Sequence, residues 1–465
     1  MPCGFTTTGA NGPSTHGAAA PATGQEVGRY APRVPGPVHD EGHAPTRQIP
    51  RSCEVLVIGA GPAGSAAAYW LAEAGFDVVV VEKKHFPREK TCGDGLTPRS
   101  VRQLEDMGLG DDLSRYHRFE GLRALAYGRE LLLRWPKHPD YGEYGYVITR
   151  AELDALVARR AEKAGATLLE GCEAIAPLGA GAGSGGPAAG AVVSEHSSGT
   201  SHDVAARIVI VADGSNSRFG RALGASRDRT IPQGMAIRGY FSSPRHDETW
   251  IESHLDLRDE TGAVIPGYGW VFPLGDGRVN VGIGIVSSFE RWKSMNTSRL
   301  MEAFVSRAPA SWCLGPESAL GEPSGGRLPM GLSVGPRQGP DYVLVGDAGG
   351  AINPFNGEGI AYGYETGRIA AAFAAEALLT GDNRVLEGYE AKLTENYGLY
   401  FKTASAFMRL MGRPEAMRLL VSTGMYSRTL MEWLLRIMSN LIRTDEIGPA
   451  ELVYGAIARL AQLAG

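Results

Sequence analysis

Three glycines with a fixed spacing are the first residues in this 465-residue chain that predict chemistry. Gly59-x-Gly61-x-x-Gly64 follows an apolar run at residues 55–58 and precedes an alanine-rich stretch. The first glycine permits a tight turn, the second lets the backbone approach a pyrophosphate, and the third lets helix and strand pack closely. The phosphates then lie at the helix N-terminus, where free N–H groups favour negative charge. The pattern therefore predicts a dinucleotide site.

An acidic residue at the end of the next strand supports this interpretation. The run 78–81 ends at Glu82, about twenty residues after the glycines, where a carboxylate accepts from ribose hydroxyls. The same glycine spacing recurs at Gly181-x-Gly183-x-x-Gly186, but inside a glycine- and alanine-rich run with no strand before it. We interpret that second copy as a flexible hairpin loop.

Two later strands each end in an aspartate beside a glycine. Residues 208–211 lead to Asp213-Gly214, and residues 342–345 lead to Gly346-Asp347. Either pair alone is also typical of an ordinary strand-end turn. With the glycine turn, and in this order, they resemble the FAD-dependent hydroxylase and reductase superfamily, in which such segments flank the flavin. The resemblance implies that the bound dinucleotide is FAD and that Asp347 accepts from a ribitol hydroxyl.

Two segments carry residue types suited to a flat ring and an apolar ligand. In Cys92-Gly93-Asp94-Gly95, small residues let a loop pass close to a flavin with a thiol beside it. The alternative is a glycine turn with a buried thiol. In Tyr268-x-Trp270-x-Phe272, the spacing of two places three rings on one face of a strand. These rings either pack in the core or line a slot for a long apolar ligand.

A third segment, Asn353-Pro354-x-Asn356-Gly357-Glu358-Gly359, precedes Ile360 and an alanine-rich run. Backbone N–H groups and the dipole at the start of a helix there would stabilise negative charge on a reduced flavin. The effect is about 0.3–1 kcal/mol at an exposed helix end and larger when the end is partly buried. We expect this segment to tune the flavin without driving the reaction alone.

Together these motifs resemble the geranylgeranyl reductase family of flavoproteins. The resemblance depends on Arg88-x-Lys-x-Cys92-Gly-Asp-Gly, Tyr268-x-Trp270-x-Phe272-Pro273 and the Asn353 segment, and it runs from about residue 53 to residue 442. The run 92–98 is most similar to that of bacterial members that saturate one isoprene unit, the β unit, of the menaquinone tail. One departure is that Pro266 stands two residues before Tyr268, where the family pattern has three.

The resemblance implies an FAD-dependent reductase that saturates a carbon–carbon double bond of an isoprenoid chain by hydride transfer from reduced flavin plus a proton. The resemblance implies menaquinone as the substrate, with geranylgeranyl diphosphate or another polyprenyl lipid as the alternative. The arginines within residues 235–285 are sparse, which argues against a diphosphate. Tyr268 and Trp270 would stabilise positive charge on the alkene by cation–π attraction of about 1–2 kcal/mol each. Phe272 joins them as a substrate-binding residue, and Cys92 is the candidate for proton delivery or for control of flavin access.

The motifs and the resemblance together give a set of residues expected to bind FAD. These are Gly59, Gly61, Ala63, Gly64, Glu82, Lys83, Arg88, Cys92, Gly93, Asp213, Gly214, Gly346, Asp347, Pro354, Gly357, Gly359 and Ile360. No metal site is expected, since the five cysteines are scattered and lack a CxxC pair. Such thiols indicate a reducing cytoplasm. The net charge of −5 argues against a nucleic-acid partner.

The reductant and the membrane are the other expected partners. The sequence has no second strand–glycine–helix unit for a nicotinamide domain, so we expect transient NAD(P)H binding or reduction by a ferredoxin-like carrier. The chain has no run of eighteen apolar residues that would span a bilayer. Residues 417–443 combine leucines and methionines with arginines, and we expect one helix there, either lying at the membrane interface or packed on the flavin lobe or the substrate tunnel. A cytoplasmic protein with peripheral contact to the inner face of the cell membrane is therefore expected.

Two other functional classes stay open at this point. A flavin monooxygenase or halogenase would share the fold. Halogenases carry Trp-x-Trp-x-Ile-Pro in place of Tyr268-x-Trp270-x-Phe272-Pro273, which argues against halogenation, whereas hydroxylation differs mainly in the reactivity toward oxygen. A non-catalytic flavin- or lipid-binding protein is the third reading, and the intact cofactor and aromatic motifs argue against it.

The elements that must position these residues predict an α/β fold: an FAD-binding Rossmann-like domain, an inserted antiparallel β-sheet substrate domain and C-terminal helices. Beyond the first unit, the patterns predict a helix within residues 146–165, strands at 167–169, 235–241, 249–257, 269–274 and 279–285, and helices at 359–379 and across 387–463. The expected domains are a disordered tail (1–50), a discontinuous FAD-binding domain (51–118, 146–232 and 337–385), a substrate domain (119–145 and 233–336) and a helical region (386–465).

Overall fold

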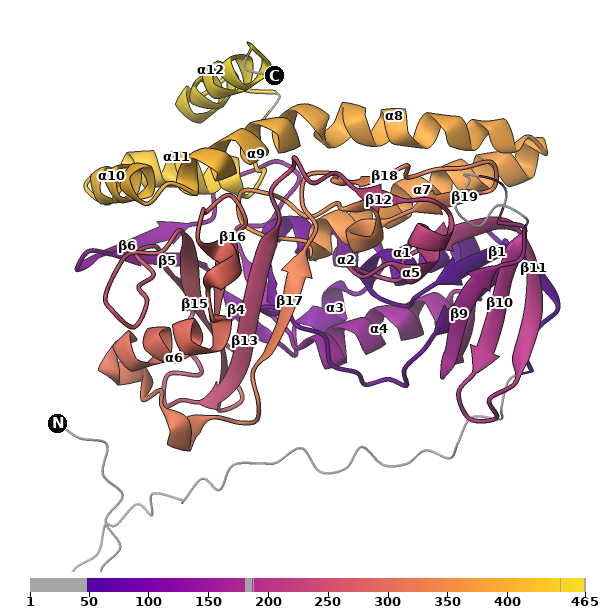
Figure 1. Ribbon diagram of the computed structural model, residues 1–465, viewed down its shortest axis with the longest axis horizontal. Coiled ribbons are helices and arrows are strands. Elements are labelled where there is room, and N and C mark those ends of the chain that lie inside the picture. Colours follow the sequence, from indigo (N-terminus) through magenta and orange to yellow (C-terminus); the bar gives the residue numbers. More distant parts are fainter. Residues whose placement is uncertain (1–47, 180–185, 187, 444, 464–465) are drawn as a thin grey trace, which may run out of the picture. The chain divides into compact units, whose positions relative to one another are not determined.

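A largely parallel sheet forms the nucleotide-binding half of the molecule (Figure 1). Its strand order is β8-β2-β1-β11-β10-β9, with β19 paired to β11. The pairs β8–β2, β2–β1, β1–β11 and β11–β19 are parallel, and β10 is antiparallel to both of its neighbours. The strands are β1 Ser52–Ile58, β2 Val78–Glu82, β8 Thr167–Glu170, β9 Cys172–Pro177, β10 Gly190–Glu195, β11 Ser201–Val211 and β19 Tyr342–Leu344.

The computed structural model describes residues 48–179, 186, 188–443 and 445–463. Nearly all of the predicted tail, and Gly181 and Gly183 of the predicted hairpin loop, lie outside these residues. Residues 48–465 form one compact unit by their contacts. The division of that unit into a flavin domain, a substrate domain and a helical region therefore stays a prediction.

Alternate residues of the central strands enter two different cores. Val55 and Val57 belong to one buried cluster, and Leu56 and Ile58 to the other. This is the period of two that a strand imposes on its side chains, and it explains why the strands are apolar throughout. The strands predicted at 55–58, 78–81, 167–169 and 208–211 are confirmed.

Helices α1 Pro62–Glu73, α4 Arg150–Lys163 and α7 Ile360–Thr380 cover one face of this sheet. The alanine-rich surfaces of α1 and α7 let the two helices approach closely: a Cβ on Gly367 would lie 2.3 Å from the carbonyl oxygen of Ala63. The helices predicted within 146–165 and at 359–379 correspond to α4 and α7.

A second sheet has the order β17-β13-β16-β15-β14-β5-β6. All its pairs are antiparallel except β14–β5, which is parallel. The predicted strand 249–257 is shorter than expected, because Asp256 accepts from the Tyr127 backbone N–H and Asp259 caps its own turn. The strands are β5 Gly121–Ala126, β6 Arg129–Arg134, β13 Gly234–Ser242, β14 Trp250–His254, β15 Gly267–Pro273, β16 Arg278–Val286 and β17 Ser324–Leu328.

Short elements connect the two halves. The small strands are β3 Gly95–Leu96, β4 His117–Phe119 and β7 Gly145–Val147, in the order β3-β7-β4, and the pair β12 Ser226–Arg227 with β18 Val334–Gly335. The helices are α2 Pro98–Asp106, α3 Gly110–Leu113, α5 Arg218–Ala222 and α6 Thr297–Arg307. Single helical turns are η1 Trp292–Ser294, η2 Ala310–Trp312, η3 Pro316–Ser318, η4 Gly346–Gly349 and η5 Asn383–Gly388.

The C-terminal region is a series of helices, of which α10 and α11 pack on the second sheet beside β5 and β6 (Figure 1). The single helix predicted for 417–443 is wrong. The chain turns after Gly424, and Ser427 accepts from the Leu430 backbone N–H to start a new helix. The helices are α8 Tyr389–Leu393, η6 Thr394–Gly398, α9 Leu399–Met411, α10 Pro414–Gly424, α11 Arg428–Met438 and α12 Pro449–Leu463.

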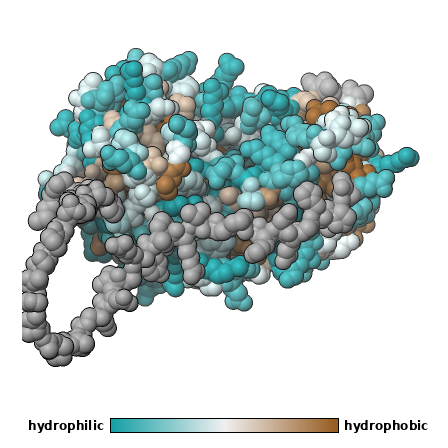
Figure 2. Space-filling model, turned by 90° about the horizontal axis from the view of Figure 1, so that it is seen from below, coloured by the Kyte–Doolittle hydropathy of each residue, from teal (hydrophilic) through white to brown (hydrophobic). Residues whose placement is uncertain are grey.

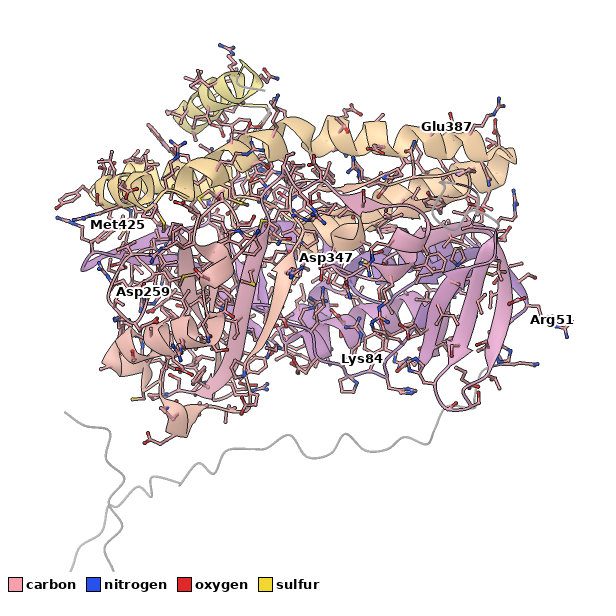
Figure 3. All side chains as sticks on the ribbon, viewed as in Figure 1. Arg51, Lys84, Asp259, Asp347, Glu387 and Met425 are labelled. Atoms are coloured by element: carbon pink, nitrogen blue, oxygen red, sulfur yellow. The ribbon has the colours of Figure 1, made fainter. Side chains whose placement is uncertain are left out.

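The face seen from below, away from the C-terminal helices, is mainly hydrophilic where it is visible, with apolar residues in separate patches (Figure 2). Asp347 lies near the middle of the molecule beside β17, whereas Met425 lies at the end of the helical layer near α10 and β6 (Figure 3). The interior position of Asp347 agrees with its limited exposure, since only 18% of its side-chain surface is accessible.

Candidate active site

The turn between β1 and α1 has the geometry that a pyrophosphate site requires. Gly59 has φ +99°, and a Cβ there would lie 2.5 Å from the carbonyl oxygen of Ala212. A Cβ on Gly64 would lie 1.9 Å from the Gly59 carbonyl oxygen, so helix and strand touch backbone to backbone. By contrast, a Cβ on Gly61 would have Arg88 Nη2, at 3.8 Å, as its nearest contact. Open space therefore lies before Gly61, at the start of α1, which has no side-chain cap.

The predicted ribose carboxylate, Glu82, is held by a buried chain of charges. It lies 3.2 Å from Arg88 Nη2, and Arg88 Nη1 donates to Asp154 at 2.9 Å. Asp154 also accepts two hydrogen bonds from Arg150, at 2.7 and 2.8 Å. The carboxylate at the end of β2 is thus oriented by Arg88, and the same network ends at Arg150, beside the loop of residues 92–95.

Of the other residues predicted near this end, Ala63 is buried in the first turn of α1, and Lys83 is exposed beside Glu82. A Cβ on Gly346 would lie 2.8 Å from the Ala63 Cβ, so the Gly346-Asp347 strand end packs against α1. This contact brings the glycine turn and that strand end together although they are far apart in the sequence.

The two strand-end aspartates differ in their partners. Asp213 accepts from a backbone N–H of α5 at 3.0 Å, while its Oδ1 is buried without a hydrogen-bond partner among the described residues. Asp347 receives Lys90 Nζ at 2.8 Å. Burial disfavours charge on Asp347, but Lys90 outweighs it and lowers the pKa of that carboxyl. Gly214 and Gly346 both have positive φ, at +83° and +55°, which explains glycine beside each aspartate.

The third segment forms a loop that leads into α7. Gly357 has φ +79°, Gly359 is the residue before the helix, and Ile360 is its buried first residue. A Cβ on Gly359 would lie 3.4 Å from Asp347 Oδ1, so this turn and the strand-end aspartate lie against each other. Pro354 packs near Gly331, where an added Cβ would lie 3.2 Å from its ring.

Glu358 in this loop is a buried acid. One of its oxygens accepts from the hydroxyls of Thr97 and Ser100 at the start of α2, and the other is buried without a hydrogen-bond partner among the described residues. Burial raises the pKa of Glu358 to about 7. The site therefore contains a carboxyl that changes charge near neutral pH.

Tyr268, Trp270 and Phe272 form a continuous aromatic strip on β15. Neighbouring ring centroids are 5.8 and 6.2 Å apart, as the spacing of two predicts. The Tyr268 hydroxyl donates to the Asn356 carbonyl oxygen at 2.7 Å, which joins the strip to the third segment. Trp270 is 4% exposed, and its Nε1 donates to Asn280 Oδ1 at 2.9 Å.

The loop of residues 92–95 lies on the same strip. A Cβ on Gly93 would lie 3.1 Å from the Phe272 ring and 3.4 Å from Trp270 Nε1, and a Cβ on Gly95 would lie 3.0 Å from Phe272. Cys92 is half-buried at the start of this loop. Burial raises the pKa of its thiol, although Arg150 opposes the shift, so Cys92 keeps its proton at neutral pH.

Comparisons with known proteins agree with this arrangement. A family model described as an FAD binding domain matches residues 52–273. The chain is 41% identical to a menaquinone reductase of Mycobacterium tuberculosis (strain ATCC 25618 / H37Rv) over 89% of this chain and 97% of the relative. The chain belongs to the geranylgeranyl reductase family of FAD-dependent oxidoreductases.

Other members and neighbours are more distant. Digeranylgeranylglycerophospholipid reductase 2 of Methanopyrus kandleri is 33% identical over 76% of this chain and 84% of that protein. The solved structure of a geranylgeranyl bacteriochlorophyll reductase-like protein from Thermoplasma acidophilum aligns with a TM-score of 0.71 and 24% identity, covering 88% of this chain and 99% of that one. A flavin-dependent brominase aligns with a TM-score of 0.67 and 16% identity over 89% and 100% of the two chains, which shows a shared fold alone.

The described residues fit FAD as the cofactor. The open space at Gly61 suits a pyrophosphate, and the unpartnered Asp213 Oδ1 and Arg88 Nε are buried polar atoms of the kind that a cofactor's polar groups satisfy. The glycine turn and the two strand ends at Asp213 and Asp347 converge here. Lys83 is exposed, whereas the other predicted cofactor residues are buried or half-buried.

Several residues of the site were not predicted from sequence. The motifs contain Asp94 and Glu358 without indicating a role for them, and Arg150, Asn280 and Gly282 lie outside every motif. A signal for two of them exists. The Gly275-Asp276-Gly277 turn sets the register of β15 and β16, and this register pairs each aromatic residue with a residue of β16: Tyr268 with Gly284, Trp270 with Gly282, and Phe272 with Asn280. A Cβ on Gly282 would lie 2.3 Å from the Trp270 ring.

Proposed function

We propose that this protein saturates a carbon–carbon double bond in the isoprenoid tail of menaquinone, at the β-isoprene unit. The observation that carries the proposal is the position of the aromatic strip. Its members contact two loops of the cofactor cradle, at Gly93 and Asn356, in a chain 41% identical to a menaquinone reductase. An apolar chain lying on this strip would therefore lie next to the cofactor.

The chemistry follows from the residues of the strip. FAD supplies the hydride when it is bound and reduced. An isolated alkene gains positive charge as it is protonated, and the π-faces of Tyr268 and Trp270 stabilise that charge. Both side chains are held by hydrogen bonds at their polar ends, which keeps their faces in place. Cys92 holds a proton beside the strip and is the proposed proton donor or gate.

An apolar layer continues from the strip toward the C-terminal helices. Phe272 packs against a buried cluster that joins the second sheet to α10 and α11, whose inward side chains are Met417, Val421, Met425, Met431 and Leu435. Methionine is flexible and adapts to an inserted apolar chain. Burying one five-carbon isoprene unit contributes about 4 kcal/mol at about 0.8 kcal/mol per carbon, so two or three units would hold the tail. We place the tail in this layer.

The charges near the strip favour a substrate without a diphosphate. Arg238 is buried and its Nη2 donates to Glu89 at 2.7 Å. Arg278 is paired with Asp276. Both guanidinium groups lie over the Tyr240 ring, at 4.3 and 5.7 Å from its centroid. Because each already has a carboxylate partner, they offer little to a diphosphate, and a quinone headgroup is the better match.

The outer face of α10 is the proposed membrane contact. Every helix among the described residues is too short or too polar to cross a bilayer. Leu419 and Leu420 on α10 are 66% and 44% exposed, and Tyr426, just after the helix, is 72% exposed. Arg413, just before the helix, and Arg418 within it are also exposed. Exposed leucines beside arginines suit peripheral binding to anionic lipid, here at the inner face of the cell membrane. The reductant is proposed to be NAD(P)H, bound transiently, or a ferredoxin-like carrier.

The test is anaerobic incubation of the dithionite-reduced protein with menaquinone in detergent, followed by mass spectrometry of the extracted lipid. The lipid is reoxidised first, since reduction of the quinone ring also adds two hydrogens. A gain of about two mass units on the tail, located by fragmentation, supports the proposal. A menaquinone with a fully saturated tail is the control and must stay unchanged. An unchanged tail, with flavin reoxidised only when air enters, would favour monooxygenase chemistry or another prenyl substrate.

A further inference from the structure

The side chain of Asn280 connects the aromatic strip to the loop of residues 92–95. Its Oδ1 accepts from Trp270 Nε1 at 2.9 Å. Its Nδ2 donates to the Cys92 carbonyl oxygen at 2.9 Å and to Asp94 Oδ2 at 2.8 Å. Asn280 is fully buried, so these three bonds are protected from competition by water. The three partners lie on one strand and one loop, up to 188 residues from Asn280 in the sequence.

The chemistry of the partners fixes the orientation of the Asn280 amide. An indole N–H only donates, so it must face the amide oxygen; a carbonyl oxygen only accepts, so it must face the amide nitrogen. The reverse orientation would leave Trp270 Nε1 against a donor and Cys92 against an acceptor. The oxygen and the nitrogen of the Asn280 side-chain amide thus hold the strip and the loop in one arrangement.

Asp94 completes this arrangement from within the loop. It is fully buried with φ +64°, and its Oδ2 accepts from both Asn280 and the Tyr240 hydroxyl, the latter at 2.6 Å. Arg238 and Arg150 favour its charge, Cys92 is its other titratable neighbour, and burial raises the pKa of Asp94 to about 6. Above that pH the carboxylate is ionised and accepts both hydrogen bonds.

We propose that Asn280, anchored by Asp94, is a positioning residue that sets the distance between the Trp270 indole and the loop of residues 92–95. This inference rests on the proposed function, because the position of the indole relative to that loop then sets how the alkene lies against the cofactor. Neither side chain is placed against the substrate. A displacement of about 1 Å at a reacting centre lowers the rate by up to about 100-fold, which is the effect that this arrangement prevents.

The first test is the reactivity of Cys92 toward iodoacetamide in Asn280→Leu, measured by mass spectrometry with the Cys172 peptide, from β9 of the other sheet, as an internal reference. The matched control is Trp312→Phe. Trp312 Nε1 donates to Glu252 Oε2 at 2.9 Å, an equally buried indole hydrogen bond on the other face of the same sheet. We expect alkylation of Cys92 to rise by about tenfold or more in Asn280→Leu, because its loop opens locally, and to change by less than about twofold in the control.

The second test separates positioning from general stability. At equal FAD content, Asn280→Leu should lower kcat for tail reduction by about 100-fold with little change in KM, whereas Trp312→Phe should keep the wild-type kcat. Asn280→Asp is the second variant should the leucine variant not fold: it keeps the Trp270 bond but sets an acceptor against Cys92 and Asp94, so the same two shifts are expected. Equal Cys92 reactivity, or equal kcat, in variants and control overturns the inference. If the wild-type protein does not reduce menaquinone, the proposed function fails, and the Cys92 ratio alone decides whether Asn280 holds the loop.

Discussion

The phosphate turn and the aromatic strip are built by opposite means. The turn of residues 59–64 depends on missing side chains, because Gly59 lies against the Ala212 backbone and Gly64 lies against the Gly59 carbonyl oxygen. The strip depends on particular side chains, held by partners such as Asn280 and Asn356 that belong to other segments. Substitutions in the turn should therefore lower the FAD content, and substitutions in the strip should lower the rate of tail reduction while FAD stays bound.

Gly64→Ala should have the largest effect. Its Cβ would lie 1.9 Å from the Gly59 carbonyl oxygen, so α1 must move away from β1. Overpacking of this kind costs about 1–3 kcal/mol or more, and the phosphate cradle opens with it. We expect the purified variant to contain less than about a tenth of the wild-type FAD, measured by absorbance after release. In the control Gly455→Ala, within α12, the added Cβ meets open space; a loss of FAD there as well would contradict the explanation.

Gly282→Ala should separate the two regions. Its Cβ would lie 2.3 Å from the Trp270 ring and 2.5 Å from the Ile237 carbonyl oxygen, so the indole must shift. We expect near-normal FAD content and a fall in tail reduction of about 100-fold. Gly284→Ala on the same strand is the comparison, since its nearest contact, the Tyr268 ring, is 3.7 Å away and a smaller loss should follow. Loss of FAD in Gly282→Ala would show that the two regions are not independent.

Asp94→Asn tests the charge of the buried carboxyl that accepts from Asn280. The pKa of Asp94 is raised to about 6 in the fold, against about 3.9 in an unfolded chain, so the native state binds the extra proton between these values. The contribution of Asp94 to stability therefore falls as the pH rises from about 4 to about 6, by about 3 kcal/mol in total. Asn keeps the acceptor and tolerates positive φ.

The free energy of unfolding of Asp94→Asn, relative to wild type, should therefore increase over that pH range and level off above it. Urea unfolding at half-unit pH steps measures this difference. A difference that does not change with pH would mean that folding does not raise the pKa of Asp94.

Leu419→Ser with Leu420→Ser should have the smallest effect on the folded protein. Both leucines are exposed on α10, so the free energy of unfolding should change by less than about 0.5 kcal/mol. Partition onto anionic vesicles should fall by about tenfold or more, since each leucine side chain inserted into lipid contributes up to about 1.5–3 kcal/mol. Leu452→Ser on α12 is the matched control, with a similarly exposed leucine outside α10. Equal loss in both would remove α10 as the contact.

Prediction from the sequence succeeded where the determining contacts are local. The glycine turn, Glu82 at the end of β2 and the alternation of Tyr268, Trp270 and Phe272 follow from spacing within a few residues, and the structure has each element in place. The helix expected over 417–443 failed for a local reason that was overlooked: Gly424 and Ser427 form an end and a new start within an otherwise continuous apolar pattern.

By itself the sequence determined the cofactor class, the family and the identity of the aromatic face, because each depends on residue types at short fixed spacings. Only the tertiary structure decided that Asn280 forms hydrogen bonds with Trp270, Cys92 and the buried Asp94. The same holds for the hydrogen bond from Lys90 to Asp347. These partners are separated by up to 257 residues. Hydrogen bonds act over about 3 Å, so the choice among many chemically equivalent partners depends on strand register and packing, which no local pattern contains.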